Sequence, residues 1–471
     1  MLDTRREGLR LWGKLEFRSG RALVKVIACG VVAAGITLLP VHPGLNDAAR
    51  WTFFILILGA GLWITEAIPS FSVALLIIAL EIMILGRPGG VFAQTPSDWE
   101  MFVRPWSSPI MWLFLGGLVL GEGAQATGLD RLFSRYVLRW FGTTPNAILL
   151  GSMSITFLFS MFMSNTATTA MMMSVMAPIL VAIKKEDRFA KALLLGIAIA
   201  ANVGGMGTII GSPPNAIAAG MLNDVYPIDF ARWMVAGLPP ALVLFILAWF
   251  YLRWAFPSTA THIDISGLEI GTRTGAQLPM WKRLMIMPVF ALTILLWMTG
   301  QFHGIPIPVI SFLPITIFAV AGILTVYEIR HLHWDVLLLL AGGLSLGVAV
   351  RQTGLAEWIV TRLPVEHLHP VVLAFFMGYL TMLLSNFMSH TAASNILVPI
   401  GMAVAAGFEP RVVIPVALGA STAMLLPIST PPNAIVFAKG SLRTADMVKG
   451  GLLMGLLGPA VAVLWCLWLF R

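Results

Sequence analysis

Two sets of small polar residues, each embedded in strongly hydrophobic sequence, are the residues of this chain best suited to bind ions. The first set is Met163-Ser164-Asn165-Thr166-Ala167 followed by Gly211-Ser212-Pro213-Pro214-Asn215, and the second is Met388-Ser389-His390-Thr391-Ala392 followed by Ser429-Thr430-Pro431-Pro432-Asn433. The sequence around Gly116-Gly117-Leu118 also returns, as Gly342-Gly343-Leu344. We interpret the pattern as an internal duplication. Paired repeats with interrupted hydrophobic segments are typical of membrane transporters, whose binding site lies where the interruptions meet.

The first element of each set is suited to anions. A new helix is expected just after Ser-Asn-Thr and Ser-His-Thr, and the start of a helix carries unpaired N–H groups and partial positive charge. With the Thr166 and Thr391 hydroxyls and the Asn165 amide, these groups could hold two carboxylates or one tetrahedral oxyanion. The motifs contain no Lys or Arg, so the predicted site relies on backbone dipoles.

The same segments also offer ligands for a small hard cation. Ser160 and Ser164 are four residues apart, on one face of a helix, and Asn165 is adjacent; the second copy offers Ser385, Ser389 and His390. Hydroxyl, amide and carbonyl oxygens suit sodium. Because a charge in the middle of a bilayer costs several kcal/mol, a cation beside an anion would lower the cost of carrying a dianion across.

Structural explanations compete with these functional ones. Small polar residues also link membrane helices by hydrogen bonds, and Asn215 and Asn433 are expected either to cap the helix after each Pro-Pro or to touch substrate. Glu122 is an acid within a hydrophobic run, although its counterpart in the second copy is Val348. The matching Pro-Pro-Asn breaks favour a binding site, because two prolines remove donors from a helix.

Composition places the chain in a membrane. Hydrophobic residues make up 58% and charged residues 11% of it, against roughly 25% charged in soluble domains. Cys29 and Cys466 lie in hydrophobic runs at opposite ends of the chain, so neither a disulfide nor a thiol-metal site is expected. The net charge of +8 is spread over segments that flank hydrophobic runs, which indicates orientation in a bilayer rather than nucleic-acid binding.

The hydrophobic runs predict an all-α membrane protein with about eleven crossings of ~20 residues each. They are expected at 22–41, 51–67, 69–86, 108–129, 190–220, 233–255, 283–302, 307–327, 334–354, 411–438 and 450–470. Two further stretches, 146–182 and 369–406, are interrupted midway by the polar motifs and are interpreted as re-entrant hairpins. Irregular backbone is tolerated at mid-depth only when it is buried or lines a wet cavity.

The distribution of charge predicts the orientation. With a cytoplasmic N-terminus, most of the 30 Lys and Arg residues fall on the cytoplasmic side, as the positive-inside rule requires. The repeats then run in opposite directions and the hairpin tips meet near the midplane. The expected organisation is a basic N-terminus 1–21, a first helix and loop 22–50, a first repeat 51–255, a cytoplasmic linker 256–281 and a second repeat 282–471.

These motifs, together with Trp63-Ile64-Thr65-Glu66-Ala67-Ile68-Pro69, resemble the divalent anion sodium symporter (DASS) family of sodium-coupled dicarboxylate, citrate and sulfate transporters. The resemblance covers nearly the whole chain after residue 50. It implies eleven spans with two opposed hairpins, a homodimer, and elevator-type movement of a transport part against a scaffold part.

The resemblance also implies ligand sets. The first sodium site carries over to Ser160, Ser164, Asn165 and the backbone of Gly211, and the second to Ser385, the backbone of Met388, His390 and the backbone of Ser429. Substrate is expected at Asn165, Thr166, Ser212, Pro213, Ser389, His390, Thr391, Thr430 and Pro431. The family usually has Asn where this chain has His390, and commonly Thr in place of Ser212. His390 could ligate sodium, carry a proton, or fill space.

The expected function is a symporter in the inner (plasma) membrane for small divalent anions, C4-dicarboxylates first, driven by sodium and requiring no cofactor. Proton coupling, exchange, and sulfate-like or other organic anions are the alternatives. An intramembrane enzyme is disfavoured, because the motifs contain no paired acids and no His-Glu-x-x-His. A channel would differ by conducting without saturable, coupled flux.

Overall fold

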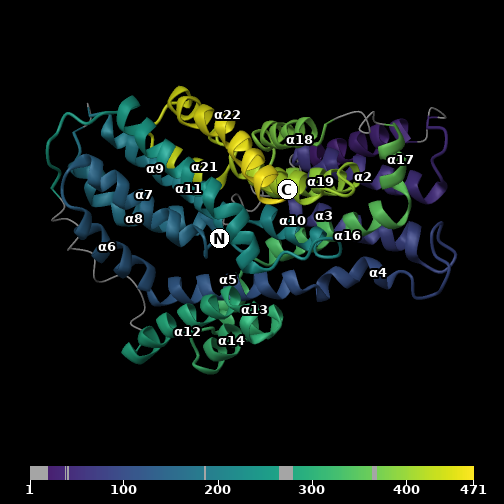
Figure 1. The fold of residues 1–471 in the computed structure, drawn as a ribbon, viewed down its shortest axis with the longest axis horizontal. Coiled ribbons are helices and arrows are strands. Elements are labelled where there is room, and N and C mark those ends of the chain that lie inside the picture. The colour runs from purple at the N-terminus through teal and green to yellow at the C-terminus, as the bar shows by residue number, and fades with distance from the viewer. Residues whose placement is uncertain (1–19, 38, 40–41, 185–186, 265–278, 363–368) are drawn as a thin grey trace, which may run out of the picture. The chain divides into compact units, whose positions relative to one another are not determined.

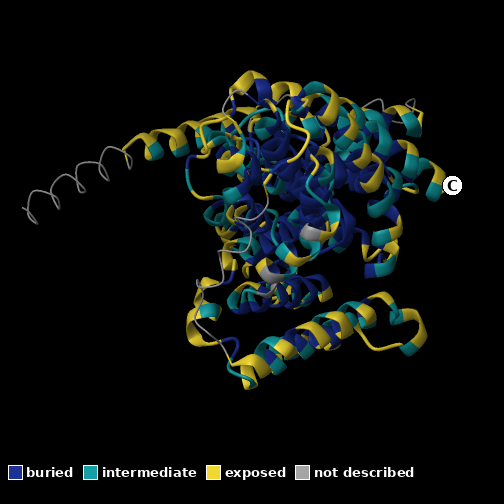
Figure 2. Ribbon diagram, turned by 90° about the vertical axis from the view of Figure 1, so that its left-hand side faces the viewer, coloured by how far each residue is buried: buried dark blue, intermediate teal, exposed yellow. Residues whose placement is uncertain are grey.

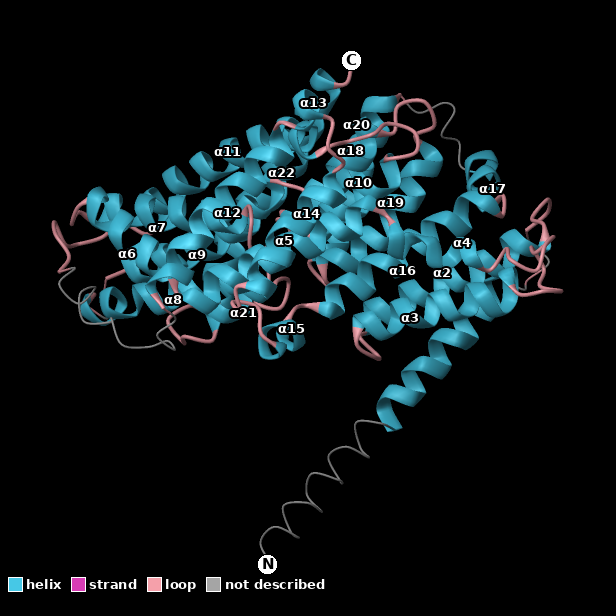
Figure 3. Ribbon diagram, turned by 90° about the horizontal axis from the view of Figure 1, so that it is seen from below, coloured by secondary structure: helices cyan, strands magenta, loops and turns pink. Residues whose placement is uncertain are grey.

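A computed structural model describes residues 20–37, 39, 42–184, 187–264, 279–362 and 369–471. Throughout these ranges the chain forms helices joined by loops, and no strand occurs in them (Figures 1 and 3). All of the N-terminal segment 1–21 except its last two residues, and residues 265–278 of the expected linker 256–281, lie outside the described residues.

Nine helices of the described chain are long and apolar enough to cross a membrane, which confirms a multi-pass membrane protein. They are Gly20–Thr37, Asp47–Thr65, Pro109–Thr127, Asn165–Ala182, Phe189–Gly207, Phe230–Ala255, Met280–Met298, Trp334–Gln352 and Thr444–Leu469. Six further apolar helices are shorter, and they include both arms of the second expected hairpin. The count of eleven crossings therefore stays a prediction.

The chain divides into two compact units, and the first contains Met1–Pro105 and Leu338–Pro364. Its elements are the helix Gly20–Thr37, α2 (Asp47–Thr65), α3 (Ser70–Leu80), the π-helical turn η1 (Glu81–Gly86), α4 (Glu100–Val103), most of α16 (Trp334–Gln352) and α17 (Leu355–Arg362). α16 packs closely here, since a Cβ on Gly342 would lie 2.4 Å from that of Ala74. The buried Glu81 carboxylate, in η1, contacts the hydroxyl of Ser345 in α16.

The second unit, Trp106–Leu337 and Val365–Arg471, contains both sets of polar motifs. Its helices are α5 (Pro109–Thr127), α6 (Leu129–Phe141), α7 (Pro145–Ser160), α8 (Asn165–Ala182), α9 (Phe189–Gly204), η3 (Gly205–Gly207), α10 (Pro213–Leu222), α11 (Phe230–Ala255), α12 (Met280–Met298), α13 (Gly300–His303), α14 (Ile307–Val320), α15 (Val326–His331), α18 (Pro370–Ser385), α19 (His390–Val404), α20 (Pro410–Ser421), α21 (Pro431–Phe437) and α22 (Thr444–Leu469). The interrupted stretches 146–182 and 369–406 are thus the helix pairs α7/α8 and α18/α19.

The internal repeat is visible in how these helices pack. α7 packs on α9 as α18 packs on α20, and α9 packs on α11 as α20 packs on α22. The two halves also exchange partners, because α10 packs on α19 and α21 packs on α8. The grouping of α7, α8 and α9 can be followed in Figure 1. Each half therefore completes the surroundings of the other half's second hairpin arm.

Two of the expected crossings are not continuous helices. The run 190–220 is α9, a 3₁₀ turn, an irregular segment and α10, and the run 411–438 is α20, an irregular segment and α21. Each resumed helix begins at the first proline of a Pro-Pro pair, where the missing N–H groups cost nothing. The expected span 307–327 is also wrong at its end, because α14 stops at Val320 and residues 326–331 form α15.

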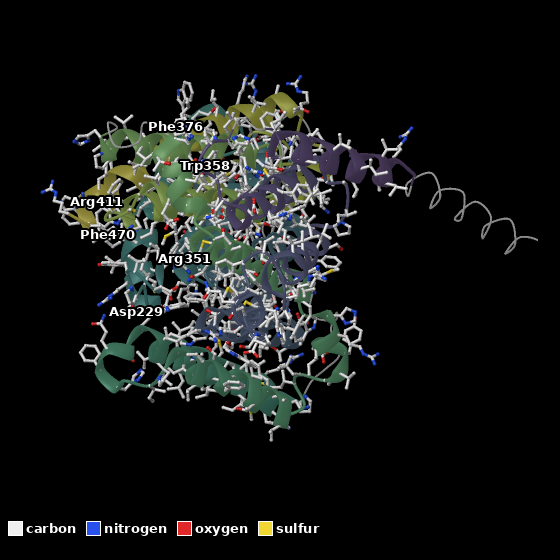
Figure 4. All side chains as sticks on the ribbon, turned by 90° about the vertical axis from the view of Figure 1, so that its right-hand side faces the viewer. Asp229, Arg351, Trp358, Phe376, Arg411 and Phe470 are labelled. Carbon is white, nitrogen blue, oxygen red and sulfur yellow. The ribbon has the colours of Figure 1, made fainter. Side chains whose placement is uncertain are left out.

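Buried residues are concentrated on the inward faces of the helices, shown dark blue in Figure 2. Within the second unit, Arg411 Nε at the start of α20 donates to the Phe470 carbonyl (2.5 Å) at the end of α22; both residues are labelled in Figure 4. α9 and α20 are the most completely buried helices of the two halves, with almost every residue inaccessible. The segment that follows α9 is also buried, whereas the segment that follows α20 is partly open, with Ile428 79% exposed.

In each half, one glycine lets a neighbouring helix approach the backbone of the interrupted segment closely. A Cβ on Gly237 of α11 would lie 2.3 Å from the Met206 carbonyl oxygen, and a Cβ on Gly451 of α22 would lie 2.3 Å from the Met424 carbonyl oxygen. Met206 and Met424 are equivalent when the Pro-Pro-Asn motifs are aligned. The same close approach thus occurs in both halves and fixes where the interrupted backbone runs.

We predict that Gly451→Ala destabilises the protein by about 1–3 kcal/mol, as overpacking of a tight contact does. Gly450→Ala is the matched control, because its Cβ would meet only side-chain atoms of Leu195, at 3.5 Å, and of Ile199, at 3.9 Å. Thermal unfolding of the purified protein in detergent measures both. Equal unfolding temperatures for the two variants would contradict the close approach.

Candidate functional site

The turns between the paired helices are shaped by serine caps. α8 begins at Asn165, and the Ser164 hydroxyl oxygen accepts the Ala167 N–H (3.1 Å). α19 begins at His390, and Ser389 accepts the Ala392 N–H (3.2 Å) in the same way. Both helices therefore start two residues earlier than expected. A serine cap leaves the first backbone N–H groups of each helix free for an external acceptor.

A single cavity of about 300 Å³ collects all four polar segments within the second unit. Of the predicted site residues, it is lined by Ser164, Asn165, Thr166, Gly211, Ser212, Pro213, Ser389, His390, Thr391, Ser429, Thr430 and Pro431. Ser160, Ser385 and Met388 do not line it and lie buried behind the tips. The described residues that line the cavity include no Lys or Arg, so at the hairpin tips positive potential comes from the helix starts.

At the first hairpin tip, which is the turn between α7 and α8, the Asn165 amide faces three oxygen atoms. The atom of the amide that points at them lies 2.6 Å from Ser160 Oγ, 3.2 Å from the Ala201 carbonyl oxygen and 3.1 Å from that of Gly211. With its nitrogen turned inward, the amide donates to these oxygens. With its oxygen turned inward, four hard oxygen ligands converge, which is the donor set that a small alkali or alkaline-earth cation prefers.

Behind the second tip, the arrangement differs. The ring of His390, at the position equivalent to Asn165, places Nε2 3.1 Å from the Ala423 carbonyl oxygen. The Ser385 hydroxyl is buried and has no hydrogen-bond partner among the residues that the structure describes. An imidazole N–H therefore satisfies a carbonyl here, and this side chain contributes no oxygen atom, unlike the Asn165 amide at the first tip.

The irregular segments are held by side chains that sequence reasoning missed. In the first half, the Thr208 hydroxyl donates to the Met161 carbonyl and accepts the Gly211 N–H (3.1 Å). In the second half, Asn386 Oδ1 accepts the Leu425 N–H (2.9 Å) and lies 3.3 Å from Ser429 Oγ. Each of these side chains joins a hairpin tip to the break beside it.

The asparagines after Pro-Pro perform a related task. Asn215 Nδ2 donates to the carbonyls of Gly205 (2.8 Å) and Thr208 (2.7 Å), and Asn433 Nδ2 donates to those of Met424 and Leu426 (both 3.0 Å). The expectation that they cap the resumed helices is wrong. They instead supply N–H groups to carbonyls of the interrupted segments, which lack the regular hydrogen bonds of a continuous helix.

The cavity also reaches Glu122 of α5, which the sequence singled out, and His333 and Asp335, which it did not. His333 Nδ1 lies 3.6 Å from Asp335 Oδ1. Interaction with this carboxylate raises the pKa of the His333 imidazole above its usual value, although partial burial opposes the shift. This part of the lining is therefore mixed in charge, unlike the neutral lining at the hairpin tips.

The whole chain from residue 21 to residue 471 matches the model of one protein family, the sodium:sulfate symporter transmembrane region. The chain belongs to this family. Two relatives are sodium-dependent dicarboxylate transporters named SdcS. The one from Staphylococcus saprophyticus is 31% identical over 91% of this chain and 88% of the relative. The one from Staphylococcus aureus strain USA300 is 30% identical over 96% and 91%.

A solved structure also shares the fold. The YdaH transporter of Alcanivorax borkumensis superposes with a TM-score of 0.52 over 87% of this chain and 98% of that chain, at 14% identity. This likeness shows the fold alone. Membership of the symporter family confirms the predicted resemblance and excludes the intramembrane enzyme, since the family and these relatives are transporters.

For this member of the symporter family, we predict that Thr208→Val destabilises the protein by about 1–3 kcal/mol, because it leaves the Met161 carbonyl without its hydroxyl donor and removes one of the two acceptors of the buried Gly211 N–H. Thr156→Val is the control. The buried Thr156 hydroxyl only donates to the carbonyl of Ser152 within α7. Chemical denaturation in detergent would reject the interpretation if both variants lost the same stability.

Proposed function

We propose that this chain is a secondary active symporter that carries small divalent anions with sodium, and that C4-dicarboxylates are its first substrates. The observation that carries the proposal is the convergence of two helix starts and two Pro-Pro breaks, one of each from each half, on one cavity without Lys or Arg among its described lining residues. Two helix starts suit a ligand with two separated anionic groups. The names of the relatives agree with this substrate class.

Sodium is the proposed coupling ion. The oxygen set around Asn165 supports a cation immediately behind the first tip, and the family is described by sodium:sulfate symport. A cation there would offset part of the cost of a dianion in a low-dielectric site. Binding of each ion then strengthens binding of the other, which is the reciprocity that symport needs.

The proposed membrane arrangement has two re-entrant hairpins in inverted orientation, with a cytoplasmic N-terminus in the inner membrane. The lengths of α18 and α19 support it, because helices of 16 and 15 residues extend only ~24 and ~22 Å against a ~30 Å hydrocarbon core. The distribution of Lys and Arg supports the orientation. A homodimer and an elevator-type movement rest on the family resemblance.

Uptake into proteoliposomes tests the proposal. Labelled succinate and labelled sulfate are each offered with an inward sodium gradient, an inward proton gradient or no gradient. We expect sodium-driven, saturable succinate uptake. Sulfate uptake alone would shift the substrate to the second candidate class, and uptake that needs only internal anion would indicate exchange.

We predict that Asn165→Ala reduces sodium-driven succinate uptake about tenfold or more, a loss of about 1.4 kcal/mol or more, because it removes the amide shared by the cavity and the oxygen set. Asn146→Ala is the matched control, since Asn146 lies exposed at the far end of α7 in the same helix pair. Equal uptake by the two variants, at equal amounts of reconstituted protein, would move the cation site elsewhere.

The second tip gives a separate prediction. The His390 ring donates to the Ala423 carbonyl and offers no oxygen atom. Replacing it by Asn places an amide oxygen at this position, as Asn165 does at the first tip. We expect His390→Asn to steepen the dependence of succinate uptake on sodium concentration and to lower the sodium concentration for half-maximal uptake. His369→Asn is the control, because this exposed histidine caps α18 at the other end of the hairpin. An unchanged sodium curve for His390→Asn would reject this role.

A further inference from the structure

Asn202 forms a polar link between the two halves inside the cavity. It lies on α9, is only 1% exposed, and is among the residues that line the cavity. Its Nδ2 lies 3.2 Å from Thr430 Oγ1, at the start of α21 in the other half. The equivalent of Asn202 in the second copy is Ala420, which has no side chain able to form such a link. The site is therefore asymmetric at this point.

The hydrogen bonds of Thr430 determine what its hydroxyl can still do. A hydroxyl oxygen accepts through two lone pairs and donates one proton. Thr430 Oγ1 accepts the Asn433 N–H (3.2 Å) and the Asn202 Nδ2–H (3.2 Å), which uses both lone pairs. The remaining function of this hydroxyl is to donate. Thr430 is 2% exposed and lines the cavity. Its hydroxyl proton therefore needs an acceptor inside the cavity.

The orientation of the Asn202 amide agrees with this assignment. As it stands, Asn202 Oδ1 is buried without a hydrogen-bond partner among the described residues. The reverse orientation would take the Thr430 proton and leave a buried NH₂ group unpaired. Buried donors without partners are rarer in proteins than carbonyl oxygens without partners, so the orientation in which Asn202 donates is favoured.

We infer that Asn202 is a positioning residue that fixes the Thr430 hydroxyl as a dedicated donor to one anionic oxygen of the substrate. The inference rests on the proposed function. The opposite position is different, because Ser212, the counterpart of Thr430, forms no side-chain capping bond at the start of α10. The second half thus presents a fixed donor, which suits a fully ionised oxygen, whereas the hydroxyl of Ser212 remains free to donate or accept.

A double-mutant cycle tests the inference. Succinate binding at saturating sodium is measured on purified protein for the wild type, for Asn202→Leu, Thr430→Val and Ser212→Ala, and for Asn202→Leu combined with each of the others. Asn202→Leu is expected to weaken binding about fivefold, and Thr430→Val about tenfold or more. In a protein that already carries Thr430→Val, Asn202→Leu should weaken succinate binding almost no further, because the hydroxyl that Asn202 positions is already absent. Combined with Ser212→Ala, the two effects should multiply.

The readouts separate positioning from a general loss of structure. Sodium affinity measured without succinate should change less than twofold in Asn202→Leu, whereas a misfolded site would lose both ligands. If the Leu variant does not fold, Asn202→Ser carries the same cycle. If the wild type binds succinate but the effect of Asn202→Leu multiplies with that of Thr430→Val as it does with that of Ser212→Ala, only the role of Asn202 is overturned. Wild-type protein that binds neither succinate nor sulfate would instead overturn the proposed function, and this inference with it.

Discussion

Broken helices in apolar surroundings impose the main constraint on this structure. Each break leaves N–H and carbonyl groups without their usual partners in a helix, and each such group that stays unpaired away from water would cost free energy comparable to a lost hydrogen bond. The chain meets this requirement twice. Asn215 and Thr208 satisfy the groups around the first break, and Asn433 and Asn386 satisfy those around the second. The irregular backbone can therefore persist inside the second unit.

The candidate site lies where the helix starts and the interrupted backbone meet. The serine caps leave N–H groups at the starts of α8 and α19, and the carbonyls of Gly211, at the first break, and of Ala201, in the last turn of α9, face the Asn165 amide. Donors and acceptors thus lie side by side without a Lys or Arg among the described lining residues. Under the proposed function, an anion and a cation bound at such a site stabilise each other.

The parts of the structure that could be predicted from sequence are those set by local chemistry. Hydrophobic runs marked the helices, Pro213-Pro214 and Pro431-Pro432 marked the breaks, and the repeat indicated that both would contribute to one place. Thr208, Asn386 and Asn202 were missed for a common reason. Their counterparts in the other copy are Leu426, Met161 and Ala420, so a comparison of the two copies does not reveal them. Each also bonds to a residue 39 or more positions away along the chain, which only the folded protein brings close.

These unmatched residues show how the two copies have diverged. Both halves keep the same helix pairs, the same Pro-Pro breaks and the same glycine contacts with Met206 and Met424. The side chains that support them differ, with a threonine brace in one half and an asparagine brace in the other. Because backbone geometry is retained while its supports change, the position of the breaks is the shared requirement. The differing side chains are then free to specialise, and in the proposed function the Asn165 amide of one half serves a cation while the Thr430 hydroxyl of the other serves an anion.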